Sequence, residues 1–335
     1  MSLFRFAPAR GPRWQLGLQA AIGIAAPIAV MTLLGHPTLG YIAGSGAFTV
    51  LFAGAAPAVE RARVLPFIAA GLTLCAALGA YASAERWLVG AGIIAVAVTA
   101  ALLCFGFRLG PPGPIFFVLV FGLSAQVTAS AAIAAPAYIA AVAAGCLFSY
   151  LVALSPLLIG RVRSHPSRRL RELFPRPVYD ATSRMLVLRV AIVAVLGVAI
   201  GIFVDPGRSY WIVGAAIAVI GLAADRRVAF ERGLHRMLGT VAGVGVYALL
   251  ALLHPQGLWI ALLLGIMQFT VELVVVRHYA LALMIITPLV LLLTGAATGQ
   301  IGQMDVALER VIDTVIGAVL GAASGVLHPR RDPAE

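Results

Sequence analysis

The sequence contains few charged residues and no lysine. Charged residues make up 11% of the 335 residues, whereas apolar residues make up 61% and the mean hydropathy is +1.01. A soluble domain carries about 25% charged residues. The scarcity of charge therefore excludes a soluble globular protein. The many long apolar runs predict an all-α membrane protein that crosses the bilayer repeatedly.

Cysteine and catalytic motifs are also scarce. Cys75, Cys104 and Cys146 each lie in an apolar run, so we expect them to pack as small apolar side chains and to form no disulfide or metal site. The sequence has no phosphate-binding loop, no His-Glu-x-x-His motif and no Gly-x-Ser-x-Gly motif. These absences argue against an enzyme, a cofactor and an ATP-driven pump.

Apolar runs between helix-breaking residues predict twelve membrane-spanning helices. The predicted spans are 16–34, 39–55, 64–82, 87–107, 114–130, 133–158, 186–204, 210–224, 234–253, 257–276, 279–297 and 305–327. The spans 39–55 and 210–224 are short. The first run follows a basic N-terminus but has spanning length and no clear cleavage site, so it predicts a retained helix rather than a signal peptide.

The two halves of the sequence resemble each other at a nearly constant offset. The matched pairs are "GHPTLGY" (35–41) with "VDPGRSY" (204–210), "VERAR" (59–63) with "FERGL" (230–234), Trp87 with Trp259, and Arg108 with Arg277. Six spans per half make both halves enter the membrane in the same direction. The sequence therefore predicts two parallel six-helix repeats, 1–159 and 186–335, joined by a linker at 160–185.

The distribution of arginine predicts the orientation. All 24 basic residues are arginine, and only Arg86, Arg208 and Arg310 lie on the side opposite the N-terminus. Because positive residues are retained on the cytoplasmic side, we expect both termini in the cytoplasm of a bacterium with the chain in its inner membrane. The basic linker 160–185 is predicted to bind anionic lipids of the inner leaflet, or alternatively a regulatory partner. The net charge of +11 then needs no nucleic-acid partner.

Three segments of the second half carry family motifs. Their key residues are Arg236, Gly239, Thr240 and Gly243; Tyr279, Ala280, Thr287 and Pro288; and Arg310, Asp313, Thr314 and Gly317. They resemble the fusaric acid resistance/aromatic acid exporter (FUSC-like) family, which implies efflux of aromatic or other organic acids. A more distant likeness to plant malate channels implies an anion channel instead. The first half lacks the arginine-aspartate pair, so the predicted pathway is asymmetric or the pair serves the second half alone.

Arg310 and Asp313 are the leading candidates for a pathway site. An arginine within an apolar helix costs about 2.5–3.5 kcal/mol on insertion scales, so it requires a partner or water. The two residues are three positions apart and share a helix face, so they can pair. A structural salt bridge and a role in lining the pathway both remain open.

A second group of candidates lies at the predicted cytoplasmic ends of the spans. Arginine there would concentrate anions at an inner mouth, although retention of positive charge in the cytoplasm explains it equally well. The candidates are Arg61, Arg63, Arg108, Arg232, Arg236 and Arg277. Glu272, with Gln268 one turn before it, is a candidate for proton coupling together with Asp313, or else pairs with Arg277 or His278. Thr287 precedes Pro288, which frees a backbone carbonyl and either shapes a binding site or only kinks the helix.

The sequence thus predicts an inner-membrane transporter that exports small organic anions, above all aromatic carboxylates, through a path between the repeats. A passive anion channel of the same architecture and a membrane scaffold without transport activity are the alternatives. A homo-oligomer is compatible with either. The sequence does not identify the solute or the coupling ion.

Overall fold

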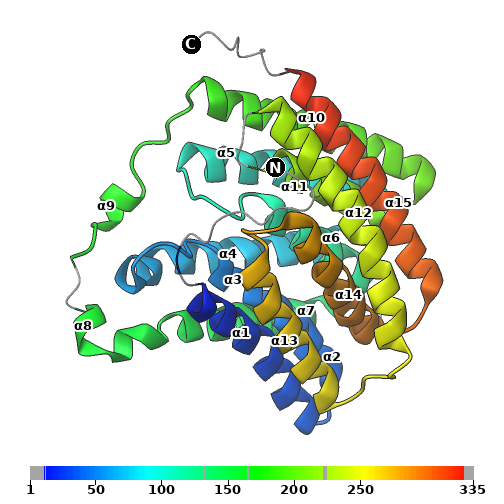
Figure 1. Ribbon diagram of the computed structural model, residues 1–335, viewed down its shortest axis with the longest axis horizontal. Helices are drawn as coiled ribbons and strands as arrows, with labels where there is room; N and C mark the ends of the chain where they lie inside the picture. The colour runs from blue at the N-terminus through cyan, green and yellow to red at the C-terminus, as the bar shows by residue number, and fades with distance from the viewer. Residues whose placement is uncertain (1–10, 12, 131–132, 164–165, 222–224, 328–335) are drawn as a thin grey trace.

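The computed structural model describes residues 11, 13–130, 133–163, 166–221 and 225–327, and these form helices and loops without any strand (Figure 1). Residues 222–224 of the predicted span 210–224 lie outside the described ranges, as do parts of both tails and of the linker. The described part of the chain is an all-α assembly, as its hydropathy predicts.

The first half and the linker form the following helices, of which the long ones match the predicted apolar runs. They are α1 (Trp14–Leu33), α2 (Pro37–Gly44), η1 (Ser45–Ala47), α3 (Phe48–Leu51), α4 (Ala58–Ala82), α5 (Arg86–Gly106), α6 (Ile115–Ala129), α7 (Ala135–Ala153), η2 (Ser155–Leu158), α8 (Gly160–Arg163) and α9 (Leu170–Leu173). The linker with α8 and α9 runs along one edge of the molecule (Figure 1).

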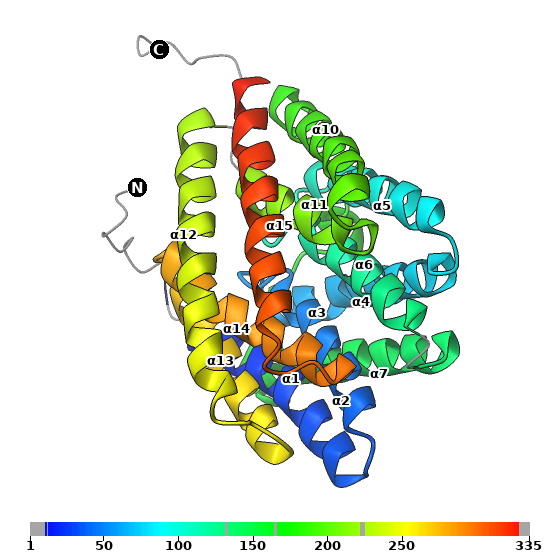
Figure 2. The ribbon, with the colours of Figure 1, turned by 90° about the vertical axis from the view of Figure 1, so that its right-hand side faces the viewer.

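The helices of the second half are similarly placed. They are α10 (Ala181–Val204), η3 (Pro206–Arg208), α11 (Ser209–Ile220), α12 (Arg226–Ala251), α13 (Leu258–Val274), α14 (Tyr279–Thr298), α15 (Met304–Ala323) and η4 (Ser324–Leu327). Helices α10, α12 and α15 stand side by side in Figure 2, and α15 packs against both of the others.

Not every predicted span is a full-length helix. Within the described ranges, eight helices are long and apolar enough to cross a membrane, and α6 and α13 are shorter apolar helices. The predicted spans 39–55 and 210–224 form only short helices. The first is divided by η1 and ends where Phe52 becomes extended, and α11 ends at Gly221, whose φ of +57° cannot continue a right-handed helix.

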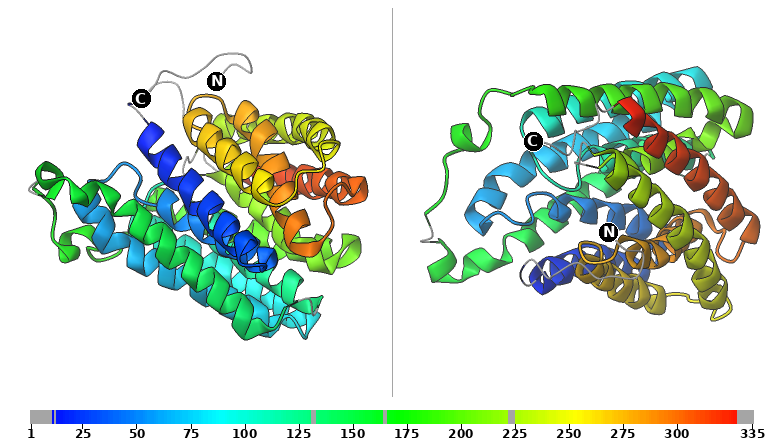
Figure 3. Two further views of the ribbon diagram at one scale, coloured as in Figure 1. Left: turned by 90° about the horizontal axis from the view of Figure 1, so that it is seen from below. Right: turned by 45° about the horizontal axis from the view of Figure 1, so that its top comes forward.

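Among the described residues, the two halves contact each other mainly through four pairs of helices. Helix α1 packs against α13 and α10 packs against α5, while α2 contacts α14 and α6 contacts α11. Helices α1 and α13 lie next to each other in the left view of Figure 3. Each of the two apolar cores draws residues from both halves, for example Tyr210 and Val213 in one and Ile24 and Tyr41 in the other. The halves are therefore packed as one body.

Glycine sets the closest helix contacts of the second half. A Cβ atom at Gly317 would lie 2.3 Å from the carbonyl oxygen of Ile212, and one at Gly321 would lie 2.6 Å from that of Ala216. Small residues at this spacing let helix backbones approach where lipid supplies no hydrophobic drive. The glycines of α15 thus hold it directly against α11, which brings the polar residues of these two helices together.

Candidate functional site

Arg310 lies at the contact between α15 and α11. Its guanidinium carbon is 3.4 Å from the centroid of the Trp211 ring, and only 8% of the residue is exposed. Its Nε and Nη1 atoms are buried without a hydrogen-bond partner. The stacking offers an arginine inside an apolar bundle some electrostatic compensation, but part of its capacity to donate hydrogen bonds is unused.

Asp313 lies one turn further along α15 and is 1% exposed. Neither carboxylate oxygen accepts a hydrogen bond, and Oδ2 is 3.7 Å from Nε of Arg208. The predicted pairing of Arg310 with Asp313 is not seen among the described residues. Arg310 turns to Trp211 instead, because α11 packs close enough to present the indole ring.

Arg208, in η3, is shared by three carboxylates. Its Nε atom is 3.3 Å from Oδ2 of Asp205, and its Nη1 atom forms an ion pair with Glu309 of α15 in addition to the longer contact with Asp313. The side chain of Arg208 is 13% exposed, whereas those of Asp205 and Glu309 are 45% and 44% exposed. One positive charge thus faces three acidic groups, of which only Asp313 is buried.

Tyr210 connects this region to the first half. It is 1% exposed, and its hydroxyl donates a hydrogen bond to Oε1 of Gln126 in α6. A Cβ atom at Gly122 would lie 2.0 Å from Cγ of Tyr210, so the glycine is what admits the ring against α6. The polar residues of α11 and α15 therefore adjoin the interface between the two halves.

Arg232 and Arg236 of α12 converge on Tyr279, the first residue of α14. Nη1 of Arg236 donates to the Tyr279 hydroxyl over 3.0 Å, and the guanidinium carbon of Arg232 is 5.1 Å from the centroid of the same ring. Nε of each arginine is buried without a hydrogen-bond partner. The charge of Arg236 acts on Arg310, so these positive groups influence one another inside the bundle.

The predicted arginines of the first half have partners of their own. Arg61 is buried and donates to Oε1 of Gln19 and to the carbonyl oxygen of Val50, each over 2.7 Å. Arg63 donates to the backbone carbonyl of Arg168 in the linker. These contacts tie α4 to α1, to the end of α3 and to the linker.

The linker is fastened to the ends of α4 and α5. Arg168 binds Glu60 through a bidentate pair of 3.1 and 2.8 Å, and this hydrogen bonding raises the pKa of Arg168. Arg108 forms an exposed ion pair of 3.3 Å with Asp180. The backbone N–H of Ser183 lowers the pKa of Asp180, with a smaller effect from Arg108. Arg277 is exposed after α13.

Glu272 and Thr287 are both buried. Nη2 of Arg13 lies 2.9 Å from Oε2 of Glu272, so its partner is an N-terminal arginine rather than the predicted Arg277 or His278. Gln268 donates to its other oxygen over 3.4 Å. Thr287 is 2% exposed and packs against Gly243 of α12, and α14 remains one helix through Pro288.

Sequence reasoning missed Trp211, Arg208 as a shared partner, and Arg189. Arg189 is fully buried in α10, where Nε donates to Oγ of Ser324 over 3.0 Å and Nη2 to the carbonyl of Gly321 over 3.3 Å. It binds the C-terminal end of α15, where free carbonyls favour a cation. The position of Arg189 within an apolar run is a sequence signal for a buried arginine. The roles of Trp211 and Arg208 follow only from the packing of α11 against α15.

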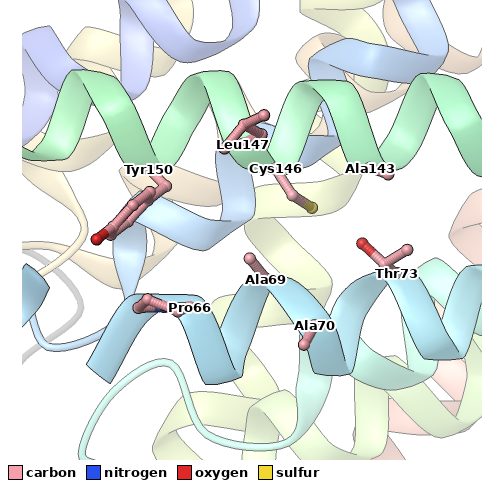
Figure 4. Close-up of a pocket in the computed structure, with 8 residues that line it drawn as sticks. All are labelled: Pro66, Ala69, Ala70, Thr73, Ala143, Cys146, Leu147 and Tyr150. Carbon is pink, nitrogen blue, oxygen red and sulfur yellow. The ribbon is translucent and has the colours of Figure 1, made fainter. Parts of the chain in front are cut away.

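A pocket of about 250 Å³ lies between α4 and α7, away from these residues (Figure 4). It is lined by Pro66, Ala69, Ala70, Thr73, Ala143, Cys146, Leu147 and Tyr150. The ring of Pro66 removes the N–H that would bind the carbonyl of Ala62, and the Tyr150 hydroxyl donates to that carbonyl over 3.1 Å. No charged side chain is among the residues that line the pocket.

The second half of the chain is similar to a known protein family. Residues 190–324 match the fusaric acid resistance protein-like family. The match confirms the resemblance predicted from the motifs and includes Trp211, Arg236, Arg310 and Asp313. The chain is a multi-pass membrane protein, and its second half is similar to a family associated with efflux and resistance.

A curated relative is also a membrane protein. The chain is 33% identical over 124 residues to a Bacillus subtilis (strain 168) protein described as "Uncharacterized membrane protein YvaC". The aligned region covers 37% of this chain and 20% of the relative, so the chain spans about a fifth of the length of that protein. No solved structure matches the chain.

Proposed function

We propose that this protein exports small organic anions, above all aromatic carboxylates, across a bacterial inner membrane. The observation that carries the proposal is the buried guanidinium of Arg310, which stacks on Trp211 while two of its nitrogen atoms lack a hydrogen-bond partner. The family match over residues 190–324 supports an efflux function.

The chemistry of the two side chains suits this class of solute. A guanidinium donates charge-assisted hydrogen bonds to a carboxylate in fixed directions, and an indole ring offers a flat apolar surface to an aromatic ring. Arg310 would hold the carboxylate and Trp211 would contact the ring. Because Arg310 is buried and Trp211 is partly buried, we take the structure to represent a closed state that opens when α11 and α15 move relative to their neighbours.

We propose that the route follows the interface between two parallel repeats. In this reading α1, α2–α3, α4, α5, α6 and α7 correspond to α10, α11, α12, α13, α14 and α15. The helix contacts support it, since α4 packs on α6 as α12 does on α14, and α1 packs on α13 as α10 does on α5. Short, interrupted segments at matching positions of two repeats often mark a transport site, and α2–α3 and α11 are such a pair.

The proposed orientation places Arg232 and Arg236 toward the cytoplasm and Arg208 toward the outside. Arg232 and Arg236 would collect the anion, and Arg310 would bind it further along. The membrane potential favours export of an anion that crosses without a proton, because 100 mV contributes about 2.3 kcal/mol per charge, or roughly a 50-fold gradient. Arg61, Arg63, Arg108 and Arg277 would serve mainly to keep their segments in the cytoplasm.

Efflux from liposomes tests the proposal. Purified protein is reconstituted with radiolabelled benzoate inside, a membrane potential is imposed, and initial efflux is compared between wild type and Arg310→Gln. Loss of hydrogen bonds to a charged group costs about 1.5–3 kcal/mol, so we expect efflux at limiting benzoate to fall about 10- to 150-fold. The exposed Arg86→Gln is the matched control and should stay within about twofold of wild type.

The outcomes separate the three functional classes. Efflux by Arg310→Gln equal to that of wild type would overturn the assignment of the site. Flux that saturates with benzoate concentration supports a carrier, whereas a current that keeps rising with driving force supports the anion channel. Wild-type liposomes no more permeable than empty ones would favour a scaffold without transport activity.

A further inference from the structure

We propose that binding of an anion at Arg310 draws a proton onto Asp313, so that the protein binds the two together. The proposal rests on the proposed function, because it concerns the same site. It joins two neighbouring observations, namely a buried carboxylate without hydrogen-bond donors and a buried guanidinium with unused ones.

Asp313 is the least satisfied acidic group among the described residues of α15. It is 1% exposed, both oxygens lack a donor, and the approach of Arg208 to 3.7 Å is longer than a hydrogen bond. A buried ionised carboxylate is costly unless it is paired and hydrogen-bonded. Small changes in the surrounding charge therefore decide whether Asp313 holds a proton.

The charged groups that act on Asp313 come from η3 and from α15 itself. Arg208 and Arg310 favour the ionised form, whereas Asp205 and Glu309 oppose it. Tyr210 is the ionisable neighbour on α11, and the charge of Arg236 on α12 reaches Arg310. Arg208 is divided among three carboxylates, and Arg310 is the second cation that acts on Asp313.

A bound anion changes this balance in one direction. Its carboxylate would take up the free donors of Arg310 and bring a negative charge within a turn of Asp313. Both effects disfavour the ionised form of Asp313, so a proton binds as the anion does. Because linkage is reciprocal, protonation of Asp313 must in turn tighten anion binding.

Glu272 is the other candidate for proton coupling, and its surroundings differ from those of Asp313. Its two oxygens receive donors from Arg13 and Gln268, at 2.9 and 3.4 Å. Both oxygens of Glu272 thus have a donor, and the residue lies on α13, away from the contact of α11 with α15. Glu272→Gln is therefore the matched control for Asp313→Asn.

The fluorescence of Trp211 reports directly on binding at the site. The other tryptophans, Trp14, Trp87 and Trp259, are 50%, 69% and 74% exposed, and replacing them by phenylalanine leaves Trp211 as the single emitter. The probe is benzenesulfonate, which stays ionised throughout the range, so that any pH dependence belongs to the protein. Its affinity for purified protein is measured from Trp211 emission between pH 5.5 and pH 8.

We expect the affinity of the wild-type site to increase as the pH falls, by up to tenfold per pH unit where Asp313 titrates. Asp313→Asn should bind the probe with an affinity that is nearly constant with pH, and Glu272→Gln should keep the wild-type slope. A second measurement needs no variant: in weakly buffered solution, adding benzenesulfonate to the wild-type protein should remove protons from the solution.

The failures of the two proposals are distinguishable. Probe binding that depends on Arg310 but neither varies with pH nor takes up protons overturns the inference and leaves the proposed function standing. The same applies if Asp313→Asn keeps the wild-type slope. Absence of binding by the wild-type protein to both benzenesulfonate and benzoate contradicts the proposed function itself, and with it this inference.

Discussion

Replacing Gly317 by alanine tests the contact that creates the candidate site. A Cβ atom there would lie 2.3 Å from the carbonyl oxygen of Ile212 and 2.6 Å from Cβ of Ala215. Ordinary contact begins at 3.4 Å, so α11 and α15 would have to separate by about 1 Å. Overpacking of this kind typically costs about 1–3 kcal/mol.

Gly245→Ala in α12 is the matched control, because no atom lies within 4 Å of a Cβ atom at that position. Both substitutions gain the same helix propensity, about 1 kcal/mol, which cancels in the comparison. We expect Gly317→Ala to be about 1–3 kcal/mol less stable than Gly245→Ala in detergent unfolding. Because the helices part, stacking of Arg310 on Trp211 should weaken and Trp211 emission should change.

The two variants can also contradict this reasoning. If Gly317→Ala were as stable as Gly245→Ala, with Trp211 emission unchanged, α15 could not lie as close to α11 as described. A stability loss without any change in Trp211 emission would mean that the stacking does not depend on the separation of these helices.

Three further substitutions address other contacts. Tyr150→Phe leaves the carbonyl of Ala62 without its donor and should cost about 1–3 kcal/mol in denaturant unfolding, with no effect on benzoate efflux; unchanged stability would mean that the carbonyl finds another donor. Arg13→Gln leaves the buried Glu272 unpaired and should cost about 1–3 kcal/mol, which Glu272→Gln in the same chain should largely restore. Asp180 caps α10 as a carboxylate, and its pKa is lowered in the folded protein. The stabilisation from this cap is therefore fully present above the unfolded pKa of about 3.9, and it is lost as the pH falls through the lower folded pKa. Unfolding measured between pH 6 and pH 3 should therefore show Asp180→Asn and wild type converging at the acidic end, and a difference that grows there would refute this assignment.

Hydropathy predicted the class of the protein and the order of its helices well. The predicted run 279–297 is α14 (Tyr279–Thr298), and the run 87–107 is α5 (Arg86–Gly106). These predictions succeed because a segment in lipid must satisfy its own backbone hydrogen bonds, so that length and composition alone decide whether it forms a helix. The predicted spans 39–55 and 210–224 were less successful, because η1 and Gly221 interrupt them through local backbone geometry.

The candidate site was predicted only in part. Family motifs and the cost of buried charge singled out Arg310 and Asp313. The spacing of Arg310 and Asp313 also suggested that they pair, since both lie on one face. It gave no information on what the neighbouring helix would present to that face.

The sequence by itself determined that this chain is a helical membrane protein. It also determined where most helices lie and which of the few charged residues are costly to bury, because each of these properties follows from residues close together in the chain. Only the tertiary structure decided the partners of those charges. Arg310 meets Trp211 across two helices, and Arg13 meets Glu272 from 259 positions away. Such contacts depend on how helices cross and how closely glycine lets them approach, and a single sequence does not specify those geometries.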